Sequence, residues 1–116
     1  MTGETLYELV RGFVNGPVFG TLARKGRAYS KEASGGDALS VFKEGASALG
    51  ISPLVYWAAL FNKHHSALLS YVRGGYAGAP PFRVIKDMVC YLLLFYALLV
   101  DLKMVNEEDV KEDGDA

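Results

Sequence analysis

Apolar residues recur at the spacing of an α-helix along most of the chain, and their longest uninterrupted run is Met88–Val100. These thirteen residues include no charge, glycine or proline. The run is too long for an ordinary strand and is rich in leucine, so it predicts a helix that is apolar on every side. A bilayer-spanning helix needs about 20 such residues, and Asp87 and Asp101 bound this run. We interpret it as a buried central helix that partner subunits help to cover, and not as a membrane span.

Four further helices are predicted ahead of this run from apolar residues at helical spacing. Asn15-Gly16-Pro17 is expected to end the first, because proline disrupts a helix interior. Asp37 is a candidate N-cap for the third, and Ser52-Pro53 is the clearest helix start in the chain. The sequence therefore predicts an all-α fold, a compact bundle of about five helices around a central apolar C-terminal helix. The predicted spans are about 2–14, 18–29, 37–49, 53–73 and, for the central helix, about 81–104.

Charge is distributed unevenly along the 116 residues, although the net charge is only −1. Positions 1–100 hold ten basic and six acidic residues, whereas positions 101–116 hold two basic and seven acidic residues. Hydrophobic residues make up 51% of the chain, as is typical of a globular domain. We therefore predict a single helical domain over 1–104 and an acidic, disordered tail over 105–116.

The cellular compartment is inferred from the cysteine content and the first residues. The single cysteine, Cys90, lies inside the apolar run and has no second cysteine with which to form an internal disulfide. No spacing of cysteine and histidine indicates zinc, and the first residues lack the basic region and apolar core of a signal peptide. We expect a cytoplasmic protein in a reducing compartment, without a membrane among its partners.

The first candidate chemistry is a basic cluster that begins in the second predicted helix, with four cations in eight residues. Such side chains can hold phosphate oxygens through charge-assisted hydrogen bonds, although a solvated helix face gives the same pattern. The cluster is short and the domain is not strongly basic, which argues against nucleic acid and favours a small phosphorylated ligand. The cluster consists of Arg24, Lys25, Arg27 and Lys31. The candidate phosphate-binding residues are Lys25, Arg27, Lys63 and Arg73, and the candidate stacking residues are Tyr29 and Tyr76.

Two adjacent histidines, His64 and His65, interrupt the apolar pattern of the fourth predicted helix. Adjacent residues on a helix point about 100° apart, whereas two histidines that share a metal are usually three or four residues apart. We therefore predict no metal at this pair. The alternatives are partly buried histidines with ordinary partners, or contacts with a ligand or another subunit.

Carboxylates are scarce in the body of the chain. A magnesium-dependent phosphohydrolase needs several carboxylates that converge on the metal, and no pair at Glu-x-x-Glu or Glu-x-x-Asp spacing lies on a predicted helix of the body. No nucleophile motif or phosphate-binding glycine motif is present either, so we name no catalytic residue and expect no cofactor. If the chain is an enzyme, magnesium is expected at Asp37, Glu44 and Asp87.

Several short motifs resemble a family of small phage and bacterial all-α proteins, the nucleotide-modification-associated domain. The resemblance covers about residues 20–100 and implies nucleotide-related work in a phage. The matching residues are Lys25-Gly26-Arg27-Ala28-Tyr29, Asp37–Lys43, Gly50–Leu54, Lys63, and Asp87 four residues before Tyr91.

The chain also departs from the family pattern, mostly where the family carries acidic side chains. Ala28 and Asn62 stand where the family has aspartate, and Arg83 stands at an acidic position. Val41 replaces an asparagine, and Ser66 replaces an arginine. If those acids hold a metal in relatives, this chain does not hold it in the same way, so the resemblance implies binding rather than cleavage.

Together, these observations favour a non-enzymatic, phage-encoded protein that binds a nucleotide in the host cytoplasm and sequesters it or a nucleotide-derived signal. The apolar excess also predicts a homo-oligomer. Two alternatives remain open. One is a metal-dependent enzyme that resembles the all-α nucleoside triphosphate pyrophosphohydrolases, and the other is a structural or protein-interaction module without a small ligand.

Overall fold

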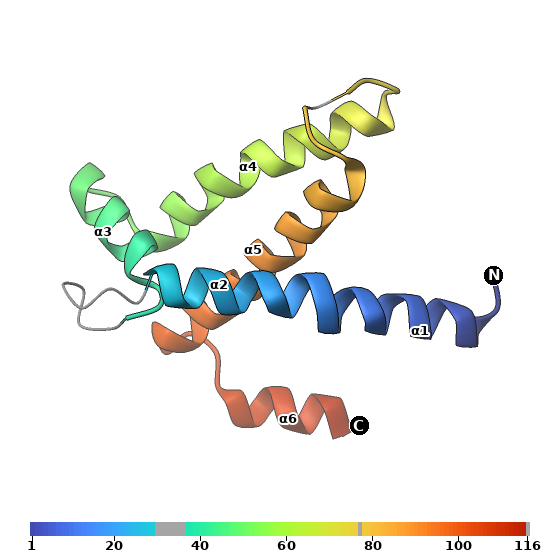
Figure 1. Ribbon diagram of the computed structural model, residues 1–116. Coiled ribbons are helices and arrows are strands. Elements are labelled where there is room, and N and C mark those ends of the chain that lie inside the picture. Colours follow the sequence, from blue (N-terminus) through green and yellow to red (C-terminus); the bar gives the residue numbers. More distant parts are fainter. Residues whose placement is uncertain (30–36, 77, 116) are drawn as a thin grey trace.

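The computed structural model describes residues 1–29, 37–76 and 78–115, and every regular element within these ranges is helical. The predicted all-α fold is therefore confirmed. Figure 1 shows α4 and α5 as a hairpin, α3 beside the start of α4, and a long rod of α1 and α2 that crosses α5. The elements are α1 (Gly3–Phe13), η1 (Val14–Val18), α2 (Phe19–Tyr29), α3 (Ser40–Leu49), α4 (Pro53–Val72), α5 (Pro81–Asp101) and α6 (Glu107–Asp115).

Most helix boundaries follow from local sequence signals. The hydroxyl of Thr2 accepts a hydrogen bond from the backbone N–H of Thr5 at 3.1 Å, and Ser52 caps α4 by accepting one from Val55 at 3.2 Å. Both satisfy an N–H that the helix itself leaves without a partner. Gly50 ends α3 in the left-handed conformation at φ 68°, which a glycine adopts without steric cost.

The prediction that Asn15-Gly16-Pro17 ends the first helix is wrong. The chain continues through η1, a π-helical turn, so that α1, η1 and α2 form the long rod of Figure 1. Pro17 lies inside this turn. The wider π turn accommodates the proline ring and its missing N–H without breaking the helix.

The core lies where α3, α4 and α5 meet. The indole ring of Trp57 is stacked between Phe61 and Phe95, with ring centroids 4.8 and 4.4 Å away. Leu98 of α5 and Phe42 of α3 are almost completely buried in the same cluster. Each fully buried side chain of this size stabilises the fold by about 1.5–3 kcal/mol, so this cluster joins the three helices.

The central helix α5 is only partly covered within a single chain. Its residues Val84, Cys90 and Leu98 are buried, but Leu92 is half exposed and Leu93 is 38% exposed. A run that is apolar on all sides does not reveal which face its neighbours cover. Here α4 and η1 pack against one side of α5, and Phe42 of α3 contacts Tyr91 on it, while the side with Leu92 stays open.

The acidic segment 105–116 includes a helix in this structure. Glu107–Asp115 form α6, and its side chains from Glu107 to Gly114 are exposed. Asn106 begins it, because its side-chain oxygen accepts a hydrogen bond from the N–H of Glu108 at 2.9 Å. An exposed helix of this length is marginal in water, so the predicted disorder of the tail over 105–116 stays a prediction.

No helix in the described ranges is long and apolar enough to cross a bilayer.

Candidate functional site

Three helices bring polar groups together around the ring of Tyr91. The ammonium of Lys25 on α2 lies 5.5 Å from the centre of that ring, within reach of a cation–π attraction. The ring of His64 on α4 lies 4.8 Å from it. Lys25, His64 and Tyr91 are far apart in the sequence, so this cluster is a product of the tertiary fold.

Tyr91 is held in place by the hydrophobic core. Its backbone carbonyl accepts a hydrogen bond from the indole N–H of Trp57 at 2.7 Å. The ring of Phe42 meets its ring edge-to-face at 6.3 Å, a favourable aromatic geometry. The polar cluster is therefore attached to a rigid part of the molecule, which suits a binding site that must keep its shape.

The electrostatics of the cluster are seen most clearly at His64, which is partly buried. Burial lowers the pKa of His64 below its ordinary value of 6.5, because the charged imidazolium loses solvation. The positive charges of Lys25 and Lys63 lower this pKa further, whereas the carboxylate of Asp87 raises it. At neutral pH the imidazole is therefore mostly uncharged, and an anion placed beside it would favour its protonation.

Positive charge predominates around the cluster. The ammonium of Lys86 lies 3.7 Å from the carboxylate of Asp87 and partly neutralises it. The guanidinium of Arg24 donates a hydrogen bond to the hydroxyl of Thr21 at 3.2 Å, and its charge acts on nearby Cys90. The lysines and arginine around the cluster thus outnumber the carboxylate.

Cys90 lies next to Tyr91 but serves the core. Its thiol is fully buried and donates a weak hydrogen bond to the carbonyl of Val18, with 3.7 Å between sulfur and oxygen. Burial is the main cause that raises the pKa of the Cys90 thiol. A buried thiol that stays protonated is a poor nucleophile, so this cysteine is structural.

The predicted phosphate-binding residues divide into two groups. Lys25 and Lys63 lie near His64, and both act on its charge. Arg73 follows the last turn of α4, about 15 Å from Lys63 along the helix axis. Tyr76 lies at that far end as well, where its ring meets the ring of Tyr71 edge-to-face at 6.3 Å.

The other predicted site residues are less informative. His65 is exposed, and its ring stacks on that of Phe61 with 6.4 Å between the ring centres. Arg27 and Tyr29 belong to the last turns of α2, but their side chains lie outside the described part of the chain. Lys31 lies outside it altogether.

The carboxylates proposed for an enzyme do not converge. Asp37 pairs with Lys43 at 2.6 Å, and the same ammonium pairs with Asp101 at 2.6 Å. Asp37 therefore lies near the C-terminal end of α5. Asp87 lies on the same helix, about 21 Å from Asp101 along its axis, and is therefore far from Asp37. Within the described ranges, no group of three or more histidine, cysteine, aspartate or glutamate side chains could hold a metal ion.

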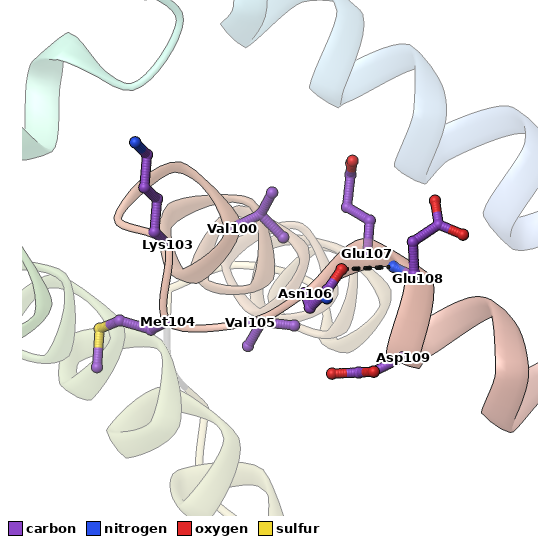
Figure 2. Close-up of a pocket in the computed structure, with 8 residues that line it drawn as sticks. All are labelled: Val100, Lys103, Met104, Val105, Asn106, Glu107, Glu108 and Asp109. Atoms are coloured by element: carbon purple, nitrogen blue, oxygen red, sulfur yellow. Dashed lines mark hydrogen bonds between the residues drawn. The ribbon is translucent and has the colours of Figure 1, made fainter.

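An open pocket of about 530 Å³ lies between the end of α5 and the start of α6 (Figure 2). Glu107, Glu108 and Asp109 line it together with one cation, Lys103. This excess of carboxylates repels phosphate, so the pocket does not suit the predicted ligand.

Tyr91 was not among the site residues predicted from the sequence. The only signal for it was its position four residues after Asp87, one helical turn away on the same face. The double ion pair of Lys43 was missed as well, because it joins segments that no local pattern connects.

No protein-family model, curated protein or solved structure matches this chain. The resemblance to the nucleotide-modification-associated domain family therefore stays a prediction from the motifs alone.

Proposed function

We propose that this protein binds a small phosphorylated ligand of the nucleotide class without chemically changing it. The observation that carries the proposal is the meeting of Lys25 and His64 at the ring of Tyr91. Lys63 lies close enough to act on the charge of His64. The family resemblance adds the biological context, in which a phage protein sequesters a nucleotide or a nucleotide-derived signal of its host.

In this proposal the phosphate lies between the ammonium groups of Lys25 and Lys63. Each ammonium donates charge-assisted hydrogen bonds to phosphate oxygens. His64 takes up a proton as the ligand binds, because a nearby phosphate favours the charged imidazolium. The carboxylate of Asp87 limits the positive charge of the empty site, which reduces the repulsion between Lys25 and Lys63.

The nucleoside part of the ligand is assigned to Tyr29, which follows Lys25 by four residues in α2. Stacking on an aromatic ring stabilises a base by about 1–3 kcal/mol. Arg73 and Tyr76 lie about three helical turns from Lys63, so they become involved only if the ligand is elongated. The proposal requires no metal, because Lys25 and Lys63 provide the positive charge at the phosphate.

The test is isothermal titration calorimetry with AMP, ADP, ATP, cyclic AMP and cyclic di-GMP, with magnesium and with EDTA. We expect at least one of these to bind equally well with or without magnesium. Lys25→Ala and Lys63→Ala should each weaken that binding. A charge-assisted hydrogen bond contributes about 1.5–3 kcal/mol, which corresponds to roughly ten- to a hundredfold in affinity.

Arg73→Ala is the matched control, since it removes an equal charge at the far end of α4 and should change the affinity of a mononucleotide little. Binding should also weaken as salt is raised, because exposed charges are screened. An equal loss in all three variants would place the phosphate elsewhere or require an elongated ligand. Absence of heat with every nucleotide would contradict the proposal, and nucleotide turnover that stops with EDTA would favour the enzyme.

A further inference from the structure

The helix α1 presents an apolar stripe that its own chain leaves uncovered. It has no buried residue, and it forms the outer half of the long rod, ending at the N-terminus away from the rest of the bundle (Figure 1). Leu6, Leu9 and Val10 lie on one side of it and are at least half exposed. The charged residues Glu4 and Glu8 lie on the opposite side, about 150° or more from the centre of the stripe.

A second uncovered stripe runs along α5. Phe82, Ile85, Leu92 and Tyr96 follow one another at steps of three, seven and four residues, which keeps them on one side of the helix. All four are exposed to 40% or more. Alternating steps of three and four are typical of a helix that packs lengthwise against another helix. Val89 divides the step of seven into steps of four and three, so the whole stripe follows this alternation.

The two stripes form one surface, because a groove joins them. Leu9, Val10 and Phe13 of α1 and Phe82 and Ile85 of α5 line this groove, which has a volume of about 280 Å³. We call the whole surface the apolar face. Its most exposed members are Leu6, Leu9, Val10, Phe82, Ile85, Leu92, Leu93 and Tyr96.

We propose that the apolar face binds a second copy of this chain in a two-fold symmetric dimer. A two-fold interface must be complementary to itself, and a surface built from exposed apolar side chains on two helices meets this requirement. Asp87 and Arg83 lie on the other side of α5, about 175° and 145° from the centre of its stripe. Pairing therefore buries none of these charges.

The size of the apolar face is sufficient for a specific dimer. Its eight side chains are between 38% and 59% exposed. If each contributes on the order of 100 Å², the face provides about 800 Å² per copy, the usual size of a stable interface. A lipid surface is the less favourable occupant, because membrane-bound amphipathic helices carry mainly lysine and arginine on their polar side, whereas α1 carries two glutamates and one arginine.

The test is the mass in solution, measured by light scattering across micromolar concentrations. We expect twice the chain mass of 12.6 kDa. Leu9→Lys on α1 and Leu92→Lys on α5 should each shift the protein to the single-chain mass. Both side chains are exposed in the single chain, so circular dichroism should show that these variants stay folded.

Val55→Lys is the matched control, since Val55 is 55% exposed on α4 but lies outside the apolar face. It should leave the mass at two chains. A wild-type protein with the single-chain mass at 100 μM would overturn the proposal, and its binding to phosphatidylcholine vesicles would then identify lipid as the occupant. A dimer that survives both Leu9→Lys and Leu92→Lys would overturn it as well.

Discussion

Gly45 on α3 is the position where the packing of two helices depends most directly on one missing side chain. A Cβ atom built there would overlap Cζ and Cε1 of the Tyr56 ring on α4 and would lie 2.7 Å from its hydroxyl oxygen. Tyr56 is partly buried against the core cluster, so its ring has little room to move. We therefore expect Gly45→Ala to destabilise the protein.

Two opposing effects set the magnitude of this change. Alanine stabilises a helix interior relative to glycine by about 0.5–1 kcal/mol, whereas overpacking a well-packed contact costs about 1–3 kcal/mol. The net loss in the free energy of unfolding should be about 1–2 kcal/mol. For a domain of this size, each kcal/mol lowers the melting temperature by about 4–8 °C.

Urea denaturation followed by circular dichroism measures this change directly. Gly20→Ala on α2 is the control, because a Cβ there meets no atom within 4 Å, and it should stabilise the protein slightly. Adding Gly45→Ala to Tyr56→Ala should cost nothing further, since the overlapping ring is gone. A Gly45→Ala variant as stable as the wild type would refute the close approach of α3 to α4.

Three further predictions concern pH, the core and the tail. The folded-state pKa of His64 lies below the unfolded value of 6.5, so the free energy of unfolding should fall as the pH decreases through and below 6.5. His64→Gln should make this dependence on pH weaker, as measured by denaturant titrations at several pH values. Leu98→Asp should prevent folding, since an isolated buried charge costs several kcal/mol. Leu93→Asp changes a partly exposed position, so this variant should fold. Light scattering should show a monomer, and calorimetry should show that it melts cooperatively. Truncation before Asn106 should leave the melting temperature nearly unchanged, and a drop of ten degrees would show that α6 stabilises the fold.

The sequence predicts the helices well where local chemistry decides their limits. Ser52-Pro53 starts α4, and Gly50 ends α3, because capping and backbone conformation act within a few residues. Pro17 was harder to interpret, since the same proline can end a helix or be contained in a π turn. The packing of η1 against α5 favours the second outcome, and such tertiary contacts leave no local signal.

The burial of α5 and the cluster at Tyr91 depend on the tertiary fold in the same way. The apolar run identified α5 as central but gave no information about its partners, so it could not show that the side of the helix with Leu93, which is 38% exposed, stays open in a single chain. Lys25 and Lys63 were chosen for their charge; Lys63 precedes His64 in the sequence, whereas only the fold brings Lys25 near it. Tyr91 could not be selected in advance, because the contact of its ring with Lys25 depends on how α2 crosses α5.

The most direct test of the proposed function is the titration of the His64 ring, followed by ¹H–¹³C NMR with each nucleotide of the calorimetry panel. His65→Gln assigns the signals, since the chain has two histidines. The account predicts that the free protein has a His64 pKa below 6.5, and that a bound nucleotide raises this pKa and shifts the His64 signals while those of His65 stay in place. Unchanged His64 signals with every nucleotide, or a shift of His65 alone, would contradict it.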